Sequence, residues 1–159
     1  MTDKTKTTID ARLAELGLEL PSASVPRGSY LPAVRSGNYL QIAGQGPRLG
    51  GDLLYAGKVG TDLSVEDGQR AAQLCALNIL SHVGRMLEGD FSRVVRIVRV
   101  AGVVQCDADF TEHAKVMNGA SDLFFAVLGE AGRHARIATG ANSLPSGMAV
   151  EVEATVEIA

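Results

Sequence analysis

The sequence has few aromatic side chains and no tryptophan, because Phe, Trp and Tyr together make up 4% of its 159 residues. A protein that binds single-stranded nucleic acid by stacking bases on aromatic rings would need more of them. Positive charge is also scarce, since 15 Lys and Arg stand against 18 Asp and Glu, for a formal net charge of −3. Affinity for phosphate backbones comes mainly from Lys and Arg, so both shortages argue against nucleic acid as a partner.

Long apolar runs and metal-binding motifs are absent as well. No apolar run approaches the about 18 residues that a membrane-spanning helix needs. Residues 1–10 are polar and lack the apolar segment of a signal peptide, so we expect a soluble, cytoplasmic protein with no membrane partner. Cys75 and Cys106 have no C-x-x-C spacing and lie in apolar runs, where a free cysteine behaves as a small hydrophobic residue. The histidines show no spacing typical of metal ligands, so no metal site is expected.

The pattern of apolar residues and turn signals predicts one α+β domain over residues 1–159, with strands and helices in the order ββαβαββ after a short N-terminal helix. The N-terminal part is expected to hold a flexible segment at 1–8, a helical extension at 9–20 with a stop at Gly17, and a hairpin at 30–47. A glycine-rich loop at 48–63, with a short edge strand near 53–56, leads to a helix that starts at Ser64. A buried central strand at 93–106, a second helix ended by 129–132, a strand and turn at 134–147, and a final strand complete the chain.

Local signals support the two long helices. Ser64 and Asp67 fit a capping box, in which each side chain satisfies a free backbone amide of the first helical turn. Apolar residues then recur at steps of three or four, as on a helix that covers a sheet. Asp107 and Asp109 are candidate caps for the second helix, whose apolar stripe runs from Phe110 onward.

The strands are indicated by different patterns. The turn 36–38, Ser-Gly-Asn, separates two runs of β-forming residues, and Gly and Asn tolerate the positive φ that such turns require. The run at 93–106 is dense in Val and Ile, although its arginines do not alternate cleanly. In the final strand apolar residues from Val150 to Ile158 alternate with Glu and Thr, so that one face is apolar and the other polar.

Three motifs carry a resemblance to a known family. They are Y-L-P-A-V followed by G-N-Y-L-Q-I-A-G-Q at 30–45, F then V-M-N-G-A-S-D-L-F-F at 110–125, and A-R then L-P-S-G-M-A-V-E-V-E-A at 135–154. Over about 130 residues, from Tyr30 to the C-terminus, the sequence resembles the RidA/YjgF family of reactive-intermediate deaminases. The last motif is the most specific, and the longer N-terminus and the loop at 48–63 are similar to a larger subgroup.

The resemblance implies a chorismate-mutase-like sandwich, a mixed sheet with two helices on one face, assembled as a homotrimer with ligand clefts between subunits. It implies hydrolysis of 2-imino acids to 2-keto acids and ammonia, with no metal or cofactor. By motif, Arg136 and Glu151 would be catalytic, and Arg136, Asn118, Tyr30 and the backbone of Ala138 would bind the substrate.

The chemistry of these residues agrees with that reaction. A 2-imino acid has a carboxylate beside an electrophilic C=N carbon, and the planar fork of Arg136 can hold a carboxylate in a fixed orientation. A carboxylate such as Glu151 can then deprotonate a bound water and return the proton to the departing amine.

Two departures from the family pattern leave alternatives open. Ala43 and Ala138 stand where a hydroxyl and a thiol are common, so a module that binds or senses a small keto or imino acid without catalysis is the second hypothesis. Endoribonuclease activity, a label carried by some members of the family, is the third, and the acidic composition argues against it. His134, two residues before Arg136, is a candidate for the mouth of the cleft.

Overall fold

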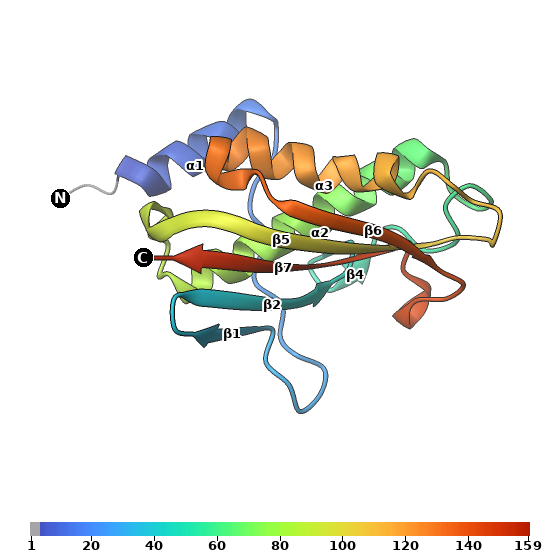
Figure 1. Ribbon diagram of the computed structural model, residues 1–159, viewed down its shortest axis with the longest axis horizontal. Coiled ribbons are helices and arrows are strands. Elements are labelled where there is room, and N and C mark those ends of the chain that lie inside the picture. The colour runs from blue at the N-terminus through green and yellow to red at the C-terminus, as the bar shows by residue number, and fades with distance from the viewer. Residues whose placement is uncertain (1–3) are drawn as a thin grey trace.

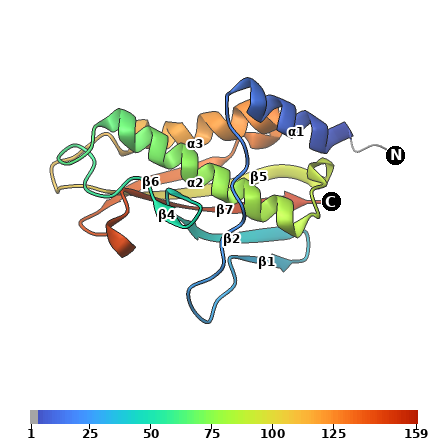
Figure 2. The same cartoon turned by 180° about the vertical axis from the view of Figure 1, so that it is seen from behind.

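The computed structural model describes residues 4–159 and consists of one five-stranded sheet with its helices on one face (Figure 1). The strands are arranged in the order β1-β2-β7-β5-β6, and a separate two-stranded ribbon joins β3 and β4. The view from behind shows α2 and α3 lying across the same face (Figure 2). No helix in the described part of the chain is long and apolar enough to cross a membrane. The predicted α+β class is confirmed.

The N-terminal helix α1 (Lys4–Glu15) begins earlier and ends sooner than the predicted 9–20. It ends where Gly17 adopts a φ of +69°, which is the stop that the sequence predicted. Residues 18–32 then continue without regular structure as far as β1. The predicted flexibility of residues 1–8 stays a prediction, and residues 1–3 lie outside the described part.

The predicted hairpin is present as β1 (Ala33–Ser36) and β2 (Tyr39–Gln45). Ser36 pairs with Tyr39 across the two-residue turn, in which Gly37 has a φ of +57°. β2 also pairs with β7 (Val150–Ile158), and their register shifts between Ile42 and Gln45. This irregularity lies at Ala43 and Gly44, beside the candidate site.

The strand predicted as central, β5 (Val94–Gln105), is interior but is not the middle of the sheet. It lies between β7, which is antiparallel to it, and β6 (Ala135–Ala141), which is parallel to it. Its register with β7 shifts twice, between Val94 and Arg96 and between Ile97 and Arg99. These irregularities explain why the arginines do not alternate. Each shift adds a residue to β5 and so changes which face the following side chains point to, with the result that Arg96 and Arg99 are both exposed.

The helix α2 (Val65–Met86) starts with the predicted capping box, because Ser64 accepts from the amide of Asp67 and Asp67 accepts from the amide of Ser64. The predicted caps of α3 (His113–Leu128) are wrong. The residue before α3 is Glu112, which makes no side-chain capping bond, and Phe110 lies outside the helix.

Asp107 is engaged elsewhere, which explains this difference. Its carboxylate accepts from Lys58 Nζ and from Thr61 Oγ1, at 2.6 Å each. It therefore ties the end of β5 to the loop at 48–63 and leaves the start of α3 uncapped. In the same loop the expected edge strand near 53–56 is reduced to β3 (Arg48–Leu49) and β4 (Asp52–Leu53), with one isolated bridge from Ala56.

The core lies between the sheet and the helices. The apolar members of β7 are buried from Val150 to Ile158, as the alternation predicted, while its glutamates lie on the opposite face. Cys75 and Cys106 are free and buried, in agreement with their interpretation as small hydrophobic residues. No helix or strand of residues 4–159 covers the other face of the sheet, where Val95 and Ile137 are each 48% exposed.

The backbones of α2 and α3 approach each other closely at Gly119. A Cβ atom added there would lie 2.9 Å from Cα of Gln69 and closer still to its carbonyl group. Because the obstacle is backbone, the two helices would have to separate. The absence of a side chain at Gly119 therefore allows α3 to pack closely against α2.

We expect Gly119→Ala to lower the free energy of unfolding by about 2 kcal/mol, measured by urea denaturation, because overpacking outweighs the better helix propensity of alanine. Ala126→Gly is the matched control on the exposed side of α3. It removes a helix-favouring side chain without a collision and should cost about 1 kcal/mol. An increase in stability for Gly119→Ala would contradict the close approach.

Candidate functional site

Arg136 lies on the edge strand β6, and its guanidinium is held by α3. Nη1 donates to Asn118 Oδ1 at 2.9 Å and to Ser121 Oγ at 3.0 Å, and Nη2 donates to the carbonyl of Ala114 at 3.3 Å. These acceptors fall on successive turns of one helix face, which is the face that packs over β6. The side chain is therefore fixed in orientation, as a group that recognises a planar anion must be.

A second layer of hydrogen bonds supports Ser121. His134 Nδ1 lies 2.7 Å from the carbonyl of Gly132, and its Nε2 lies 2.9 Å from Ser121 Oγ. Burial lowers the pKa of His134, and the nearby charge of Arg136 lowers it further, against the opposing effect of the Gly132 carbonyl. We therefore assign a neutral ring whose Nδ1–H donates to Gly132 and whose Nε2 accepts from Ser121. The serine oxygen is then free to accept from Arg136.

The guanidinium keeps part of its binding capacity. Of the five N–H donors of an arginine, three are used by these bonds, which leaves Nε–H and one N–H of Nη2 without an acceptor in the described part of the chain. Arg136 borders a hollow of about 400 Å³. The hollow is lined by Ser121, Asp122, Phe125, Gly132, Arg133, His134 and Arg136. Two free donors at such a hollow suit a carboxylate.

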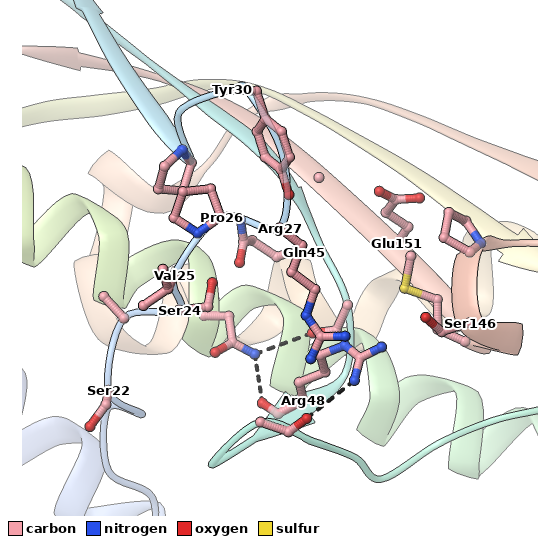
Figure 3. Close-up of a pocket in the computed structure, with 18 of the residues that line it drawn as sticks. Ser22, Ser24, Val25, Pro26, Arg27, Tyr30, Gln45, Arg48, Ser146 and Glu151 are labelled. Atoms are coloured by element: carbon pink, nitrogen blue, oxygen red, sulfur yellow. Dashed lines mark hydrogen bonds between the residues drawn. The ribbon is translucent and has the colours of Figure 1, made fainter.

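Glu151 lies in a different and larger cavity of about 760 Å³ (Figure 3). Burial raises the pKa of its carboxyl, and the neighbouring charge of Glu153 raises it further. Gly44 leaves the space that the carboxyl occupies, since a Cβ there would lie 2.9 Å from Glu151 Cδ and closer to Oε1. The irregularity in β2 and the glycine within it therefore create room for a partly buried acid.

Tyr30 borders the same cavity, but from the segment before β1 rather than from the strand itself. Its side chain is drawn near the top of the cavity, with Arg27 and Arg48 below it (Figure 3). Tyr30 is 53% exposed, so one side of its ring faces outward.

The structure does not bring the two catalytic candidates together within one chain. Arg136 of β6 is aligned with Val100 of β5, and Val100 is aligned with Ala154 of β7. Val100 and Ala154 are buried under the helices, so Arg136 lies on the helix-covered face of the sheet. Glu151 alternates with the buried Val150, so it lies on the opposite face of the sheet. Arg136 and Glu151 accordingly border separate hollows.

The remaining predicted residues divide in the same way. Asn118 lies beside Arg136, whereas Tyr30 lies on the side of Glu151. Ala138 is aligned with Gly102 of β5 and its side chain packs against the core, and it lines neither of the two hollows. Ala43 precedes Gly44, and its carbonyl accepts from Gln45 Nε2 at 3.0 Å.

No group of three or more His, Cys, Asp or Glu side chains in the described part is placed to hold a metal ion.

Several neighbours of these residues were not found from the sequence. Ser121 lies three residues after Asn118, on the same helix face, so the helical period could have indicated it. Arg27 comes from the irregular segment before β1 and Arg48 from the two-residue strand β3, and neither is long enough regular structure to show a periodicity. Gly44 falls within the predicted hairpin, and nothing local in the sequence shows which side chain would need its space.

Comparison with known proteins identifies the family of the chain. Residues 10–154 match the family described as "YjgF/chorismate mutase-like, putative endoribonuclease". Protein TCP17 of Trypanosoma cruzi is 44% identical over 151 residues, which cover 94% of each chain. The chain therefore belongs to the YjgF family, as its resemblance to RidA/YjgF proteins predicted.

Two solved structures are similar over nearly the whole chain. The protein Atu1372 from Agrobacterium tumefaciens has a TM-score of 0.92 and 45% identity, with 98% of this chain and 95% of that one covered. A protein from Shewanella oneidensis has a TM-score of 0.90 and 36% identity, with 94% and 99% covered. These coverages mean that most of the segment before Tyr30 has a counterpart in these relatives.

Proposed function

We propose that this protein is a small hydrolase that converts reactive 2-imino acids to 2-keto acids and ammonia, at sites formed between the copies of a homotrimer. The observation that carries the proposal is the guanidinium of Arg136, which is held by Asn118 and Ser121 with two donors left for a carboxylate. Membership of the YjgF family supports it.

The reaction needs one activated water and no covalent intermediate with the protein. Arg136 would bind the carboxylate of the substrate and so fix the position of the C=N carbon beside it. Water adds to that carbon, a proton is transferred to nitrogen, and the resulting carbinolamine breaks its C–N bond to give a ketone and ammonia. The oxygen of the product comes from the water.

Glu151 would transfer the protons. A carboxyl whose pKa is raised by burial is a stronger base than an exposed one and is easier to protonate near neutral pH. It can take a proton from the attacking water and give one to the departing nitrogen. Tyr30, in the same cavity, would close the site over the substrate.

The assembly is proposed because one chain keeps Arg136 and Glu151 on opposite faces of its sheet. A second copy, packed against the sheet face that no helix covers, could place its Arg136 near the Glu151 of the first. Cyclic symmetry would repeat that contact and close a ring. The exposed apolar side chains of that face, such as Val95 and Ile137, would become buried in the process.

The test is a direct assay of imine breakdown. An amino-acid oxidase generates 2-iminobutyrate or 2-iminopropionate in situ, and semicarbazide traps the imine that remains. We expect the protein to reduce the amount trapped and to speed the release of ammonia, whereas an equal mass of serum albumin should do neither.

The same preparation decides the alternative of a binding or sensing module. Ala43 and Ala138 contribute no hydroxyl or thiol, which favours that alternative if chemistry fails. No acceleration for either imine, together with calorimetric binding of 2-ketobutyrate, would replace the hydrolase proposal with the sensing one. Ribonuclease activity would have to copurify with the protein and disappear in a site variant before it was considered.

A further inference from the structure

The cavity beside Glu151 is enclosed by the segment 18–32, which we call the strap. The strap is attached to α2 at two consecutive residues. Ser81 Oγ donates to the carbonyl of Pro21 at 2.7 Å, and Ser24 Oγ lies 3.1 Å from His82 Nε2. His82 is buried, which lowers its pKa and keeps the ring neutral. The strap is thus a fixed wall of the cavity.

A second wall is fixed by Asn78, a buried residue of α2. Its Nδ2 donates to the carbonyls of Gly46 at 3.2 Å and of Arg48 at 2.9 Å. These bonds hold the chain where it leaves β2, and Arg48 Nη1 donates to the carbonyl of Gly51 at 3.2 Å. The backbone of Arg48 and one end of its side chain are therefore oriented before any ligand arrives.

Two guanidinium groups enter this cavity from these two walls. Arg27 comes from the strap and Arg48 from β3, and the guanidinium groups of both lie in the lower part of the cavity (Figure 3). No carboxylate of residues 9–159 forms an ion pair with either arginine. The only acidic side chain that lines the cavity is Glu151, whose raised pKa follows from burial and from Glu153 rather than from either arginine.

Two positive charges directed into one partly enclosed space repel each other, and an anion placed between them relieves that repulsion. Arginine also presents the planar set of donors that matches carboxylate and phosphate groups. The cavity therefore holds two separate charged groups. Glu151 is the acid proposed for proton transfer, and Arg27 and Arg48 are two basic side chains without an ion-pair partner among residues 9–159.

We propose that the cavity selects acids that carry a second anionic group, which Arg27 and Arg48 bind at the end of the substrate remote from the reacting carbon. This inference rests on the proposed function, in which Arg136 binds the first carboxylate. It makes the preferred substrates imino acids derived from amino acids with an anionic side chain. The neutral imines of alanine and of 2-aminobutyrate would then be poorer substrates.

The test compares equilibrium affinities of stable keto acids by calorimetry in phosphate-free buffer. 2-Oxoglutarate and 2-oxopentanoate have the same carbon chain and differ in the terminal carboxylate. We expect 2-oxoglutarate to bind at least about tenfold more tightly, because it adds charge-assisted hydrogen bonds to two arginines. 3-Phosphohydroxypyruvate, with a phosphate at its end, shows which of the two anions is preferred.

The preference should disappear in the double variant Arg27→Gln/Arg48→Gln, with the affinity for 2-oxopentanoate unchanged. Arg70→Gln is the matched control, since Arg70 is an exposed arginine of α2 that pairs with Asp67 and lines none of these cavities. Equal affinities in the unaltered protein, or a preference that survives the double variant, would overturn the proposal. The calorimetric affinities are measured with stable keto acids and without turnover. They can therefore be interpreted even if the protein fails to hydrolyse imines.

Discussion

Arg136→Ala should remove nearly all imine hydrolysis and leave the fold intact. The variant loses the two N–H groups available to the substrate carboxylate. Two charge-assisted hydrogen bonds at about 1.5 kcal/mol each correspond to a loss of about 100-fold in kcat/KM. The rate of ammonia release from 2-iminobutyrate, measured with the unaltered protein and the variant at equal concentration, checks this expectation.

Two further variants separate the contribution of charge from that of geometry. Arg136→Lys keeps a positive charge but has no planar fork, so its activity should remain well below that of the unaltered protein. Arg70→Ala removes an exposed arginine of α2 and should change the rate less than twofold. An Arg136→Ala variant that retains full activity would contradict the role of Arg136, whatever the outcome for the lysine variant.

The elements that could be predicted from the sequence are those set by neighbouring residues. The capping box at Ser64 and Asp67 involves residues three apart, and the turn at Gly37 depends on its own φ angle. The burial of β7 follows from its strict alternation. By contrast, the position of Asp107 before a helix indicates a cap, whereas in the structure Lys58, 49 residues away, binds it instead.

The arrangement of the candidate site was predictable only in part. The alternation of β7 indicates that Glu151 faces away from the core. For β6, however, the run from Ala135 to Ala141 holds small residues on both sides, so that the face of Arg136 could not be read from it. The opposite faces of the two residues follow from the pairing of β6 with β5, and β5 contains two irregularities that hide its own alternation.

A mixture of two inactive variants should recover activity. In the proposed ring, which has one site at each contact, each site would take Arg136 from one copy and Glu151 from the next. Arg136→Ala and Glu151→Gln should each be inactive alone, the second because general acid–base catalysis is lost. In co-expressed trimers that mix at random, a site is complete when an Arg136 and a Glu151 meet, which gives about one quarter of the unaltered activity.

The control replaces the Glu151→Gln chain with the double variant Arg136→Ala/Glu151→Gln. No chain of that mixture carries Arg136, so no site can be complete and no activity should return. We expect native mass spectrometry of tagged chains to show mixed assemblies of the mass of the proposed trimer, about three times the 16.6 kDa of one chain. Mixed trimers without recovered activity would mean that Arg136 and Glu151 do not meet across a subunit contact. Because β6 and β7 hold them on opposite faces of one sheet, a shared site would then require a rearrangement of the strands themselves.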